Sequence, residues 1–342
     1  MDNMYILAIV STAISAILTP FVRKFAVRFN VIDVPKDHRR VHNKPTPLLG
    51  GLAIYFSFVI TLILCKGALT NSEIGLIIGA TIIVIGGVID DKYNIRPWEK
   101  LLFQISAALV LIFFGVSINV ITNPISNIYE FINIGYLCIP LTIIWIVGIT
   151  NAVNLIDGLD GLAAGISLIA SITLFIISIL NSRNEAATLI IIFSGAILGF
   201  LPYNFNPATI FMGDTGSQLL GFMLAGISIR GAIKSAVAFS IAVPILALGI
   251  PIYDTLFAMI RRKINGKPIM APDRGHLHHR LLDMGLTQKQ VVAIMYIISA
   301  ILGTFSIIAM EINPQKSYFV LLAVMIVLIL IAWRAGFFKH KE

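Results

Sequence analysis

The sequence has 342 residues, of which 58% are hydrophobic and only 12% are charged. A soluble domain would carry about twice that charged fraction, so the composition excludes an ordinary soluble protein. The net charge of +8 does not indicate nucleic-acid binding, because the basic residues lie in short stretches between long apolar runs, as in membrane proteins.

Eleven apolar segments are candidate transmembrane helices, each of which needs about 20 predominantly apolar residues. Backbone polar groups in lipid must be satisfied within the segment, so these segments are expected to be helical. The predicted fold is all-α, a polytopic membrane protein with a single transmembrane domain over residues 1–342. The segments are approximately 4–22, 50–65, 74–89, 100–116, 136–151, 162–180, 187–203, 215–230, 235–258, 289–310 and 317–334.

Two of these regions carry local signals. The first span starts near Tyr5 with no preceding Lys or Arg, and it is expected to be retained rather than cleaved as a signal peptide. The ninth contains Pro244, Gly249 and Pro251, which predict a kink or a break. The segment 117–135 is predicted to be an outer loop or hairpin.

The distribution of charge predicts the orientation. Loops 23–49, 90–100 and 259–289, together with the tail from Arg334, hold 20 of the 25 Lys and Arg, and such an excess marks cytoplasmic loops. We therefore expect a multi-pass protein of the cytoplasmic membrane with its N-terminus outside and its C-terminus in the cytoplasm. All six His and 12 of the 17 acidic residues also fall on the cytoplasmic side. Topology does not require this clustering, whereas a functional surface facing the cytoplasm would.

The first cytoplasmic loop, about residues 23–49, ends in a stiff and tightly turning segment. His42 and Lys44 lie just before its end and are candidates for an anion clamp. The plainer interpretation is a loop that is basic only for topological reasons. Pro45 and Pro47 restrict the backbone of this segment, whereas Gly50 and Gly51 allow it to turn and to approach other backbone closely.

The second loop, about residues 90–100, begins with Asp90 and Asp91 at the end of the third span. Adjacent helical residues point about 100° apart, so one carboxylate could hold a metal or a lysine while the other braces a neighbouring helix. The alternative is a simple helix terminus with Lys92 and Lys100 as counter-ions. Acidic residues at a helix C-terminus oppose the macrodipole, which weakens that alternative.

The third loop, about residues 152–161, contains Asn154, Asp157 and Asp160, which would share one helical face. Gly158 beside them leaves room for a ligand. No Lys or Arg lies nearby in the sequence to compensate the two carboxylates, which favours a cation or a polar ligand over a structural role.

The fourth loop, about residues 203–214, contains Asn204, Phe211 and Asp214. Asp214 could be only a helix N-cap. The alternative is that Asp214 binds a metal ion beside free backbone N–H groups, and that the metal and these groups together would hold a pyrophosphate. Phe211 could pack in the core or stack on a base.

The fifth loop, about residues 259–288, contains Arg274, His276, His278 and His279. Three histidines within four residues could bind a transition metal. The basic residues around them make an anion site equally plausible, such as one for a diphosphate or a sugar phosphate.

Together the loops offer oxygen ligands for a hard cation and basic groups for an anion. The only soft ligands, Cys65 and Cys138, lie at other span ends. This combination predicts Mg²⁺, with Mn²⁺ as a substitute, and a phosphate-bearing substrate.

Five motifs in this order resemble the polyprenyl-phosphate N-acetylhexosamine-1-phosphate transferases, over about residues 23–285. They are the segments 45–51, 90–91, 154–161, 211–217 and 276–279. The pattern from Asp273 to His279 is similar to the branch that transfers GlcNAc-1-phosphate to undecaprenyl phosphate. In the related phospho-MurNAc-pentapeptide transferases three histidines are consecutive, whereas Leu277 interrupts them here.

The resemblance implies roles for individual residues. Asp214 corresponds to the main Mg²⁺ ligand, and Asp90 and Asp91 correspond to the pair that serves the polyprenyl phosphate and the metal. The loop with Arg274, His278 and His279 would bind the amino sugar and diphosphate. The positions implied to hold uridine are Lys44, Leu155, Gly158, Asp160, Asn204 and Phe211.

The expected activity is transfer of a sugar-1-phosphate from UDP-GlcNAc to undecaprenyl phosphate, which releases UMP and starts a cell-surface glycan such as a teichoic acid or O-antigen. The resemblance also implies a homodimer. One alternative is the phospho-MurNAc-pentapeptide transferase of peptidoglycan synthesis. An alternative of another class is a membrane transporter, which the broken ninth span and Asp254 favour.

Overall fold

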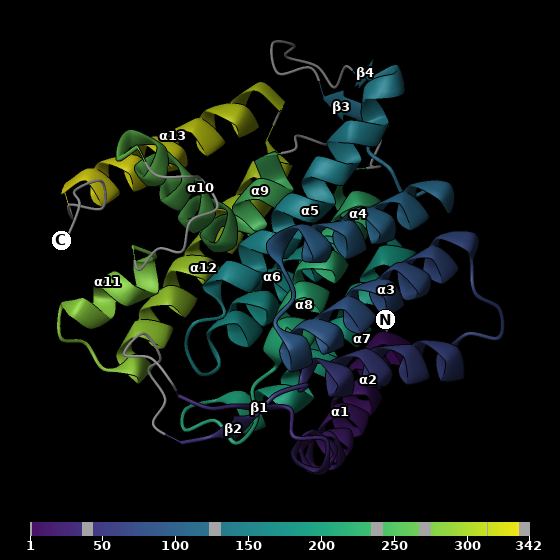
Figure 1. Cartoon of the computed structure of the whole chain (residues 1–342). Helices are drawn as coiled ribbons and strands as arrows, with labels where there is room; N and C mark the ends of the chain where they lie inside the picture. Colours follow the sequence, from purple (N-terminus) through teal and green to yellow (C-terminus); the bar gives the residue numbers. More distant parts are fainter. Residues whose placement is uncertain are drawn as a thin grey trace.

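The computed structural model describes residues 2–35, 44–122, 131–233, 242–266, 275–312 and 314–334. The chain forms a bundle of helices with two short strand pairs at opposite ends (Figure 1). Its helices are α1 (Asp2–Arg28), α2 (Gly51–Cys65), α3 (Asn71–Tyr93), α4 (Pro97–Phe113), α5 (Cys138–Ile156), α6 (Leu162–Leu180), α7 (Asn184–Asn204), α8 (Gly213–Ser228), α9 (Ala242–Ala247), α10 (Gly249–Ile264), α11 (Leu277–Asp283), α12 (Gln288–Glu311) and α13 (Pro314–Arg334).

Each of the eleven predicted spans coincides with helix in the described residues. In the part of the chain that the structure describes, six helices are long and apolar enough to cross a membrane, namely α1, α3, α5, α6, α7 and α12. The chain is therefore a helical, polytopic membrane protein, as its composition predicted.

The ninth span is broken, as its prolines and glycine predicted. Helix α9 ends at Ala247, and α10 begins at Gly249. The first part of this predicted span, up to residue 241, lies outside the described residues. A further short helix, α11, lies in the fifth of the predicted loops, about residues 259–288, and was not predicted.

Within the described residues, two antiparallel strand pairs are the only departure from an all-α fold. In the first loop, β1 (Ile32–Asp33) pairs with β2 (Thr46–Pro47). In segment 117–135, β3 (Val120–Thr122) pairs with β4 (Phe131–Asn133), which confirms the hairpin there.

Helix α8 lies at the centre of the bundle and packs against α3 and α5. All of its residues from Thr215 to Ser228 are buried. Glycines let its neighbours reach its first turn, because a Cβ at Gly51 would lie 2.3 Å from the Gly216 Cα and one at Gly87 would lie 2.4 Å from the Thr215 Cα. These close approaches bring the ends of α2, α3 and α8 to one place, where the site lies.

Candidate active site

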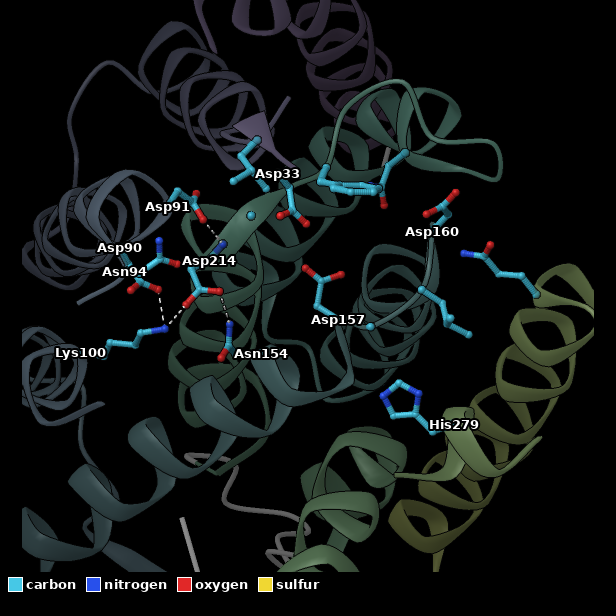
Figure 2. A pocket seen from close by; sticks show the side chains of 17 residues that line it. Asp33, Asp90, Asp91, Asn94, Lys100, Asn154, Asp157, Asp160, Asp214 and His279 are labelled. Carbon is cyan, nitrogen blue, oxygen red and sulfur yellow. Dashed lines mark hydrogen bonds and ion pairs between the residues drawn. The ribbon is translucent and has the colours of Figure 1, made fainter. Parts of the chain in front are cut away.

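The predicted loops meet around a cavity of about 380 Å³ (Figure 2). Its lining side chains come from the first loop, the ends of α3, α5 and α7, and the starts of α4, α8 and α12, with one from α11. Six of them are carboxylates: Asp33, Asp90, Asp91, Asp157, Asp160 and Asp214. Lys100 is the single Lys or Arg among the lining residues.

Lys100 joins two of these carboxylates. Its ammonium forms an ion pair with Asp90 Oδ2 and donates a hydrogen bond of 2.5 Å to Asp214 Oδ2. Asp90 is buried and also accepts a bond from the Ile95 N–H at 2.9 Å. A single cation thus neutralises charge from the end of α3 and from the start of α8.

Asp91 braces the first turn of α8. Its carboxylate accepts hydrogen bonds from the Asp214 N–H (2.7 Å), the Thr215 N–H (3.2 Å) and the Thr215 hydroxyl (2.6 Å). Gly213 makes this possible, since its φ is +70° and a Cβ there would lie 2.3 Å from Asp91 Oδ2. The adjacent acids therefore divide their tasks as one interpretation of the sequence predicted, with Asp90 holding a lysine and Asp91 bracing a helix.

Asp214 is fixed from a third direction. The Asn154 amide donates to Asp214 Oδ1 at 3.1 Å and to the Ser217 hydroxyl at 2.8 Å. Gln104 also donates a hydrogen bond to Gln218 Oε1 at 3.1 Å. This bond turns the Gln218 amide nitrogen toward Asp214 Oδ2, which lies 3.4 Å away. Asp214 is therefore more than a helix cap, because α4, α5 and α8 all position its carboxylate.

Asp157 projects into the middle of the cavity, between Asp214 and Asp160 in Figure 2. Its carboxylate accepts no hydrogen bond from the part of the chain that the structure describes. Burial, followed by the charges of Asp214 and Asp91, raises its pKa well above the usual range of a carboxyl. A carboxylate that is crowded by like charge and lacks donors is suited to a cation.

Asp160 lies on the opposite side of the cavity from Lys100 (Figure 2). Its Oδ2 accepts hydrogen bonds from the Asn206 amide and from the Ala208 N–H, both at 3.0 Å. The same Asn206 nitrogen donates to Gln288 Oε1 at 2.7 Å. These bonds tie the loop after α7 to the starts of α6 and α12.

The loop after α7 also carries Asn204 and Phe211, and both line the cavity. The Phe211 backbone is held between Pro47 and Gly50, with N–H to O distances of 2.8 and 3.0 Å. Asn204 donates to the Ile210 carbonyl, whereas its buried Oδ1 has no partner in the described residues. The stiff segment predicted in the first loop therefore serves to seat Phe211.

The three histidines lie in different surroundings. His276 is buried, and its Nδ1 lies 2.8 Å from Asp254 Oδ2, while Asp254 Oδ1 accepts the Leu277 N–H at 2.8 Å. His278 packs against Gly158, and burial, followed by the charge of His279, lowers the pKa of His278 to about 3. Only His279 lines the cavity.

The structure thus brings most of the predicted site residues together, but not all of them. Lys44 is exposed, and Leu155, His276 and His278 do not line the cavity. His42 and Arg274 lie outside the described residues. The predicted residues that line the cavity are Asp90, Asp91, Asn154, Asp157, Gly158, Asp160, Asn204, Phe211, Asp214 and His279.

Sequence reasoning missed four polar residues of the cavity: Asp33, Asn94, Lys100 and Gln288. Lys100 was considered only as a surface counter-ion, although a lysine ten residues after two adjacent acids was a usable signal. Nothing near Asp33 or Gln288 in the sequence marks either residue as part of a site.

The donor set fits a hard cation such as Mg²⁺. The cavity offers carboxylate and amide oxygens, and Mg²⁺ is usually held by one or two carboxylates plus substrate phosphates and water. Among the described residues no three His, Cys, Asp or Glu side chains form a ready metal-binding group. Asp91 and Asp214 each accept three hydrogen bonds, whereas Asp157 accepts none from the described residues, so Asp157 has the most oxygen lone pairs available to an ion.

The comparisons with known proteins agree with one another. The family model described as glycosyl transferase family 4 matches residues 73–232. The chain is 40% identical, over 97% of its length and 92% of the relative, to a probable undecaprenyl-phosphate N-acetylglucosaminyl 1-phosphate transferase of Bacillus subtilis.

More distant relatives include two further enzymes. The chain is 32% identical to a decaprenyl-phosphate N-acetylglucosaminephosphotransferase of Mycolicibacterium smegmatis, over 95% of this chain and 87% of that protein. It is 30% identical to a phospho-N-acetylmuramoyl-pentapeptide-transferase of Clostridium botulinum, over 88% and 93% of the two chains.

Proposed function

Because the chain belongs to the polyprenyl-phosphate N-acetylhexosamine-1-phosphate transferases of glycosyl transferase family 4, we propose that it transfers GlcNAc-1-phosphate from UDP-GlcNAc to undecaprenyl phosphate. The transfer releases UMP and starts a cell-surface glycan. The proposal includes eleven membrane spans in the cytoplasmic membrane, with the N-terminus outside and the cavity facing the cytoplasm. The family likeness also implies a homodimer, which the mass of the solubilised protein would test.

The single observation that carries this proposal is the cavity itself. Six carboxylates and one lysine converge from segments that are far apart in the sequence, at the ends of helices that cross the bilayer. A lipid phosphate approaches from the bilayer and a nucleotide sugar from water, so their reaction requires a site at this interface. A structural membrane scaffold has no use for so many carboxylates in one cavity.

Mg²⁺ is part of the proposal, with Asp214 as its principal ligand and Asp157 or Asp91 as a second. When bound, the ion would offset repulsion between the two phosphate-bearing substrates and stabilise the leaving UMP. Asp90 and Lys100 then keep Asp214 in place, and Asp91 keeps the first turn of α8 in place.

The lipid phosphate needs little activation by the protein. The second pKa of a phosphate monoester is roughly 6, so it is already a dianion at neutral pH. Phosphoryl transfer requires mainly positioning and charge stabilisation. Asp90, Asp91 and Asp214 are each hydrogen-bonded or ion-paired, which favours direct attack by the lipid phosphate over a covalent aspartyl intermediate.

The test is turnover by the purified protein with undecaprenyl phosphate and a panel of UDP-sugars. UMP release and lipid-linked product are expected with UDP-GlcNAc, and UDP-MurNAc-pentapeptide is the donor that would support the other branch of the family. EDTA should abolish UMP release, and Mg²⁺ or Mn²⁺ should restore it.

Asp214→Asn should lower UMP release by at least about 100-fold, since it removes a charge that acts on the reacting groups. The variant should stay folded in the membrane, because an amide can keep several of the bonds. Full activity of Asp214→Asn, or equal activity in EDTA, would discard the metal assignment.

The transporter alternative rested on the broken ninth span and on Asp254. The structure gives Asp254 a local task, since it holds His276 and the start of α11. Substrate flux into sealed vesicles without any covalent product would nevertheless favour a transporter.

A further inference from the structure

Gln288, at the start of α12, lines the cavity on the side of Asp160. It is half-buried and lies more than 70 positions beyond the last carboxylate of the site. Neither the sequence motifs nor the carboxylate chemistry assigns it a role.

The hydrogen bonds among Asp160, Asn206 and Gln288 fix the orientation of two side-chain amides, those of Asn206 and Gln288. A carboxylate only accepts hydrogen bonds, so the Asn206 group that faces Asp160 Oδ2 must be its NH₂. The Gln288 atom that faces the same NH₂ at 2.7 Å must therefore be its oxygen. The Gln288 NH₂ group is consequently turned away from Asn206, and it donates no hydrogen bond to the described residues.

Asp160 has a matching unused atom. Its Oδ2 takes both hydrogen bonds, from Asn206 and Ala208, whereas Oδ1 accepts none from the described part of the chain. This side of the cavity thus offers one hydrogen-bond acceptor, Asp160 Oδ1, and one donor, Gln288 Nε2. The loop that supplies Asn206 and Ala208 also supplies the Phe211 ring.

We propose that Gln288 is a specificity-determining residue that donates from Nε2 to a carbonyl oxygen of the donor's uracil ring, while Asp160 Oδ1 accepts the adjacent ring N–H. This inference rests on the proposed function. Uracil has a carbonyl on each side of that N–H, so it offers a donor beside an acceptor. A neutral amide and a carboxylate do not suit a diphosphate, which places the phosphates toward Lys100 across the cavity.

The decisive variant is Gln288→Glu, because its carboxylate keeps an acceptor for Asn206, removes the donor and places a negative charge where the amide nitrogen was. We expect the KM for UDP-GlcNAc to rise about tenfold, since a favourable hydrogen bond is replaced by repulsion, with kcat changed less than about twofold. Inhibition by UMP should weaken by the same factor. Inhibition by ribose 5-phosphate, which lacks the base, should not change.

The matched control is Gln290→Glu, which makes the same charge change in the same helical turn. Gln290 is exposed and caps α12 through Oε1, which accepts the Thr287 N–H at 2.9 Å. A glutamate preserves this capping box, so its KM should match the wild type. Gln288→Ala, with about a fivefold rise in KM, tests the donor without an added charge.

The outcomes separate the two proposals. An unchanged KM in Gln288→Glu, or an equal loss for UMP and ribose 5-phosphate, would overturn the role of Gln288 and leave the proposed function intact. A higher KM for UDP-GlcNAc with unchanged inhibition by UMP would show that Gln288 contacts the sugar rather than the uracil ring. If the wild type releases no UMP from UDP-GlcNAc, the proposed function fails, and calorimetric binding of UMP to both proteins still tests Gln288.

Discussion

Lys100 is positioned between the carboxylates of Asp90 and Asp214, one at the end of α3 and the other at the start of α8. Removing one partner of a buried ion pair leaves uncompensated charge, which costs far more than the intact pair contributes. The lysine therefore fixes the position of both carboxylates. Because it borders the open cavity, it can also contact a substrate phosphate.

Lys100→Met should lower UMP release by at least about 100-fold, since it removes positive charge beside the developing anion. Initial rates of UMP release at saturating substrates would measure the loss. Lys92→Met is the control, because Lys92 is exposed at the end of the same acidic motif, and its rate should match the wild type. A Lys100→Met enzyme with near-normal rates would show that the Asp90–Asp214 pair functions without this cation.

The first turn of α8 is held by backbone contacts that only glycine permits. Gly51 and Gly87 let α2 and α3 approach it, and Gly213 lets Asp91 reach its N–H groups. These three glycines thus help to build the same site to which the acidic residues contribute their carboxylates. Their role is packing, since they bring three helix ends together.

Gly87→Ala should lower the free energy of unfolding by about 1–3 kcal/mol, because its methyl group would overpack against the backbone of Thr215. It should also lower UMP release, since Thr215 and Asp214 move together. Gly148→Ala is the matched control, because Gly148 is also helical and a Cβ there would meet nothing within 4 Å. Thermal unfolding in detergent would compare them, and equal midpoints would contradict the close packing of α3 on α8.

Helix α11 is anchored at its start by one carboxylate of α10. Asp254 accepts from the Leu277 N–H and pairs with His276, and the Asp254 and His276 side chains are both buried. This anchor sets the direction in which His279 enters the cavity. The buried acid of the broken ninth span is therefore explained by a neighbouring loop.

Asp254→Ala should raise the KM for UDP-GlcNAc more than it lowers kcat, because His279 would lose its fixed position while the acidic cluster stays intact. It should also lower the midpoint of thermal unfolding, since a buried N–H and a buried imidazole lose their acceptor. Asp283→Ala, at the exposed other end of α11, should change neither value. An unaltered KM in Asp254→Ala would remove α11 from the donor site.

At the scale of the whole molecule, the strand pairs β1–β2 and β3–β4 mark opposite ends of the bundle (Figure 1). The cavity includes Asp33 of β1, so it lies at the end of β1–β2. The predicted orientation places that end of the bundle in the cytoplasm. It places outside the end of α2 that carries Cys65 and the end of α5 that carries Cys138.

A membrane-impermeant maleimide should therefore label Cys65 in intact cells, where this residue is exposed at the end of α2. Lys92→Cys, introduced into a variant without the two native cysteines, should be labelled only after the cells are permeabilised. The reverse pattern would invert the topology and place the cavity outside the cell.

The sequence by itself determined the class of the protein and the chemistry of its site. Apolar runs and their interruptions depend on local composition, so they predicted the helices, the break between α9 and α10, and the hairpin in segment 117–135. Acidic residues close to glycines likewise marked three of the five predicted loops, about residues 90–100, 152–161 and 203–214. These features are readable because each is specified within a few residues along the chain.

Only the tertiary structure decided which group each acid contacts. Lys100 and Asp214 are 114 positions apart, and Asn206 and Gln288 are 82 apart. Such pairs depend on how closely the helices pack at glycine contacts, and no local pattern encodes that distance. For the same reason, three histidines within four residues of the sequence separate into one paired with Asp254, one buried against Gly158 and one in the cavity.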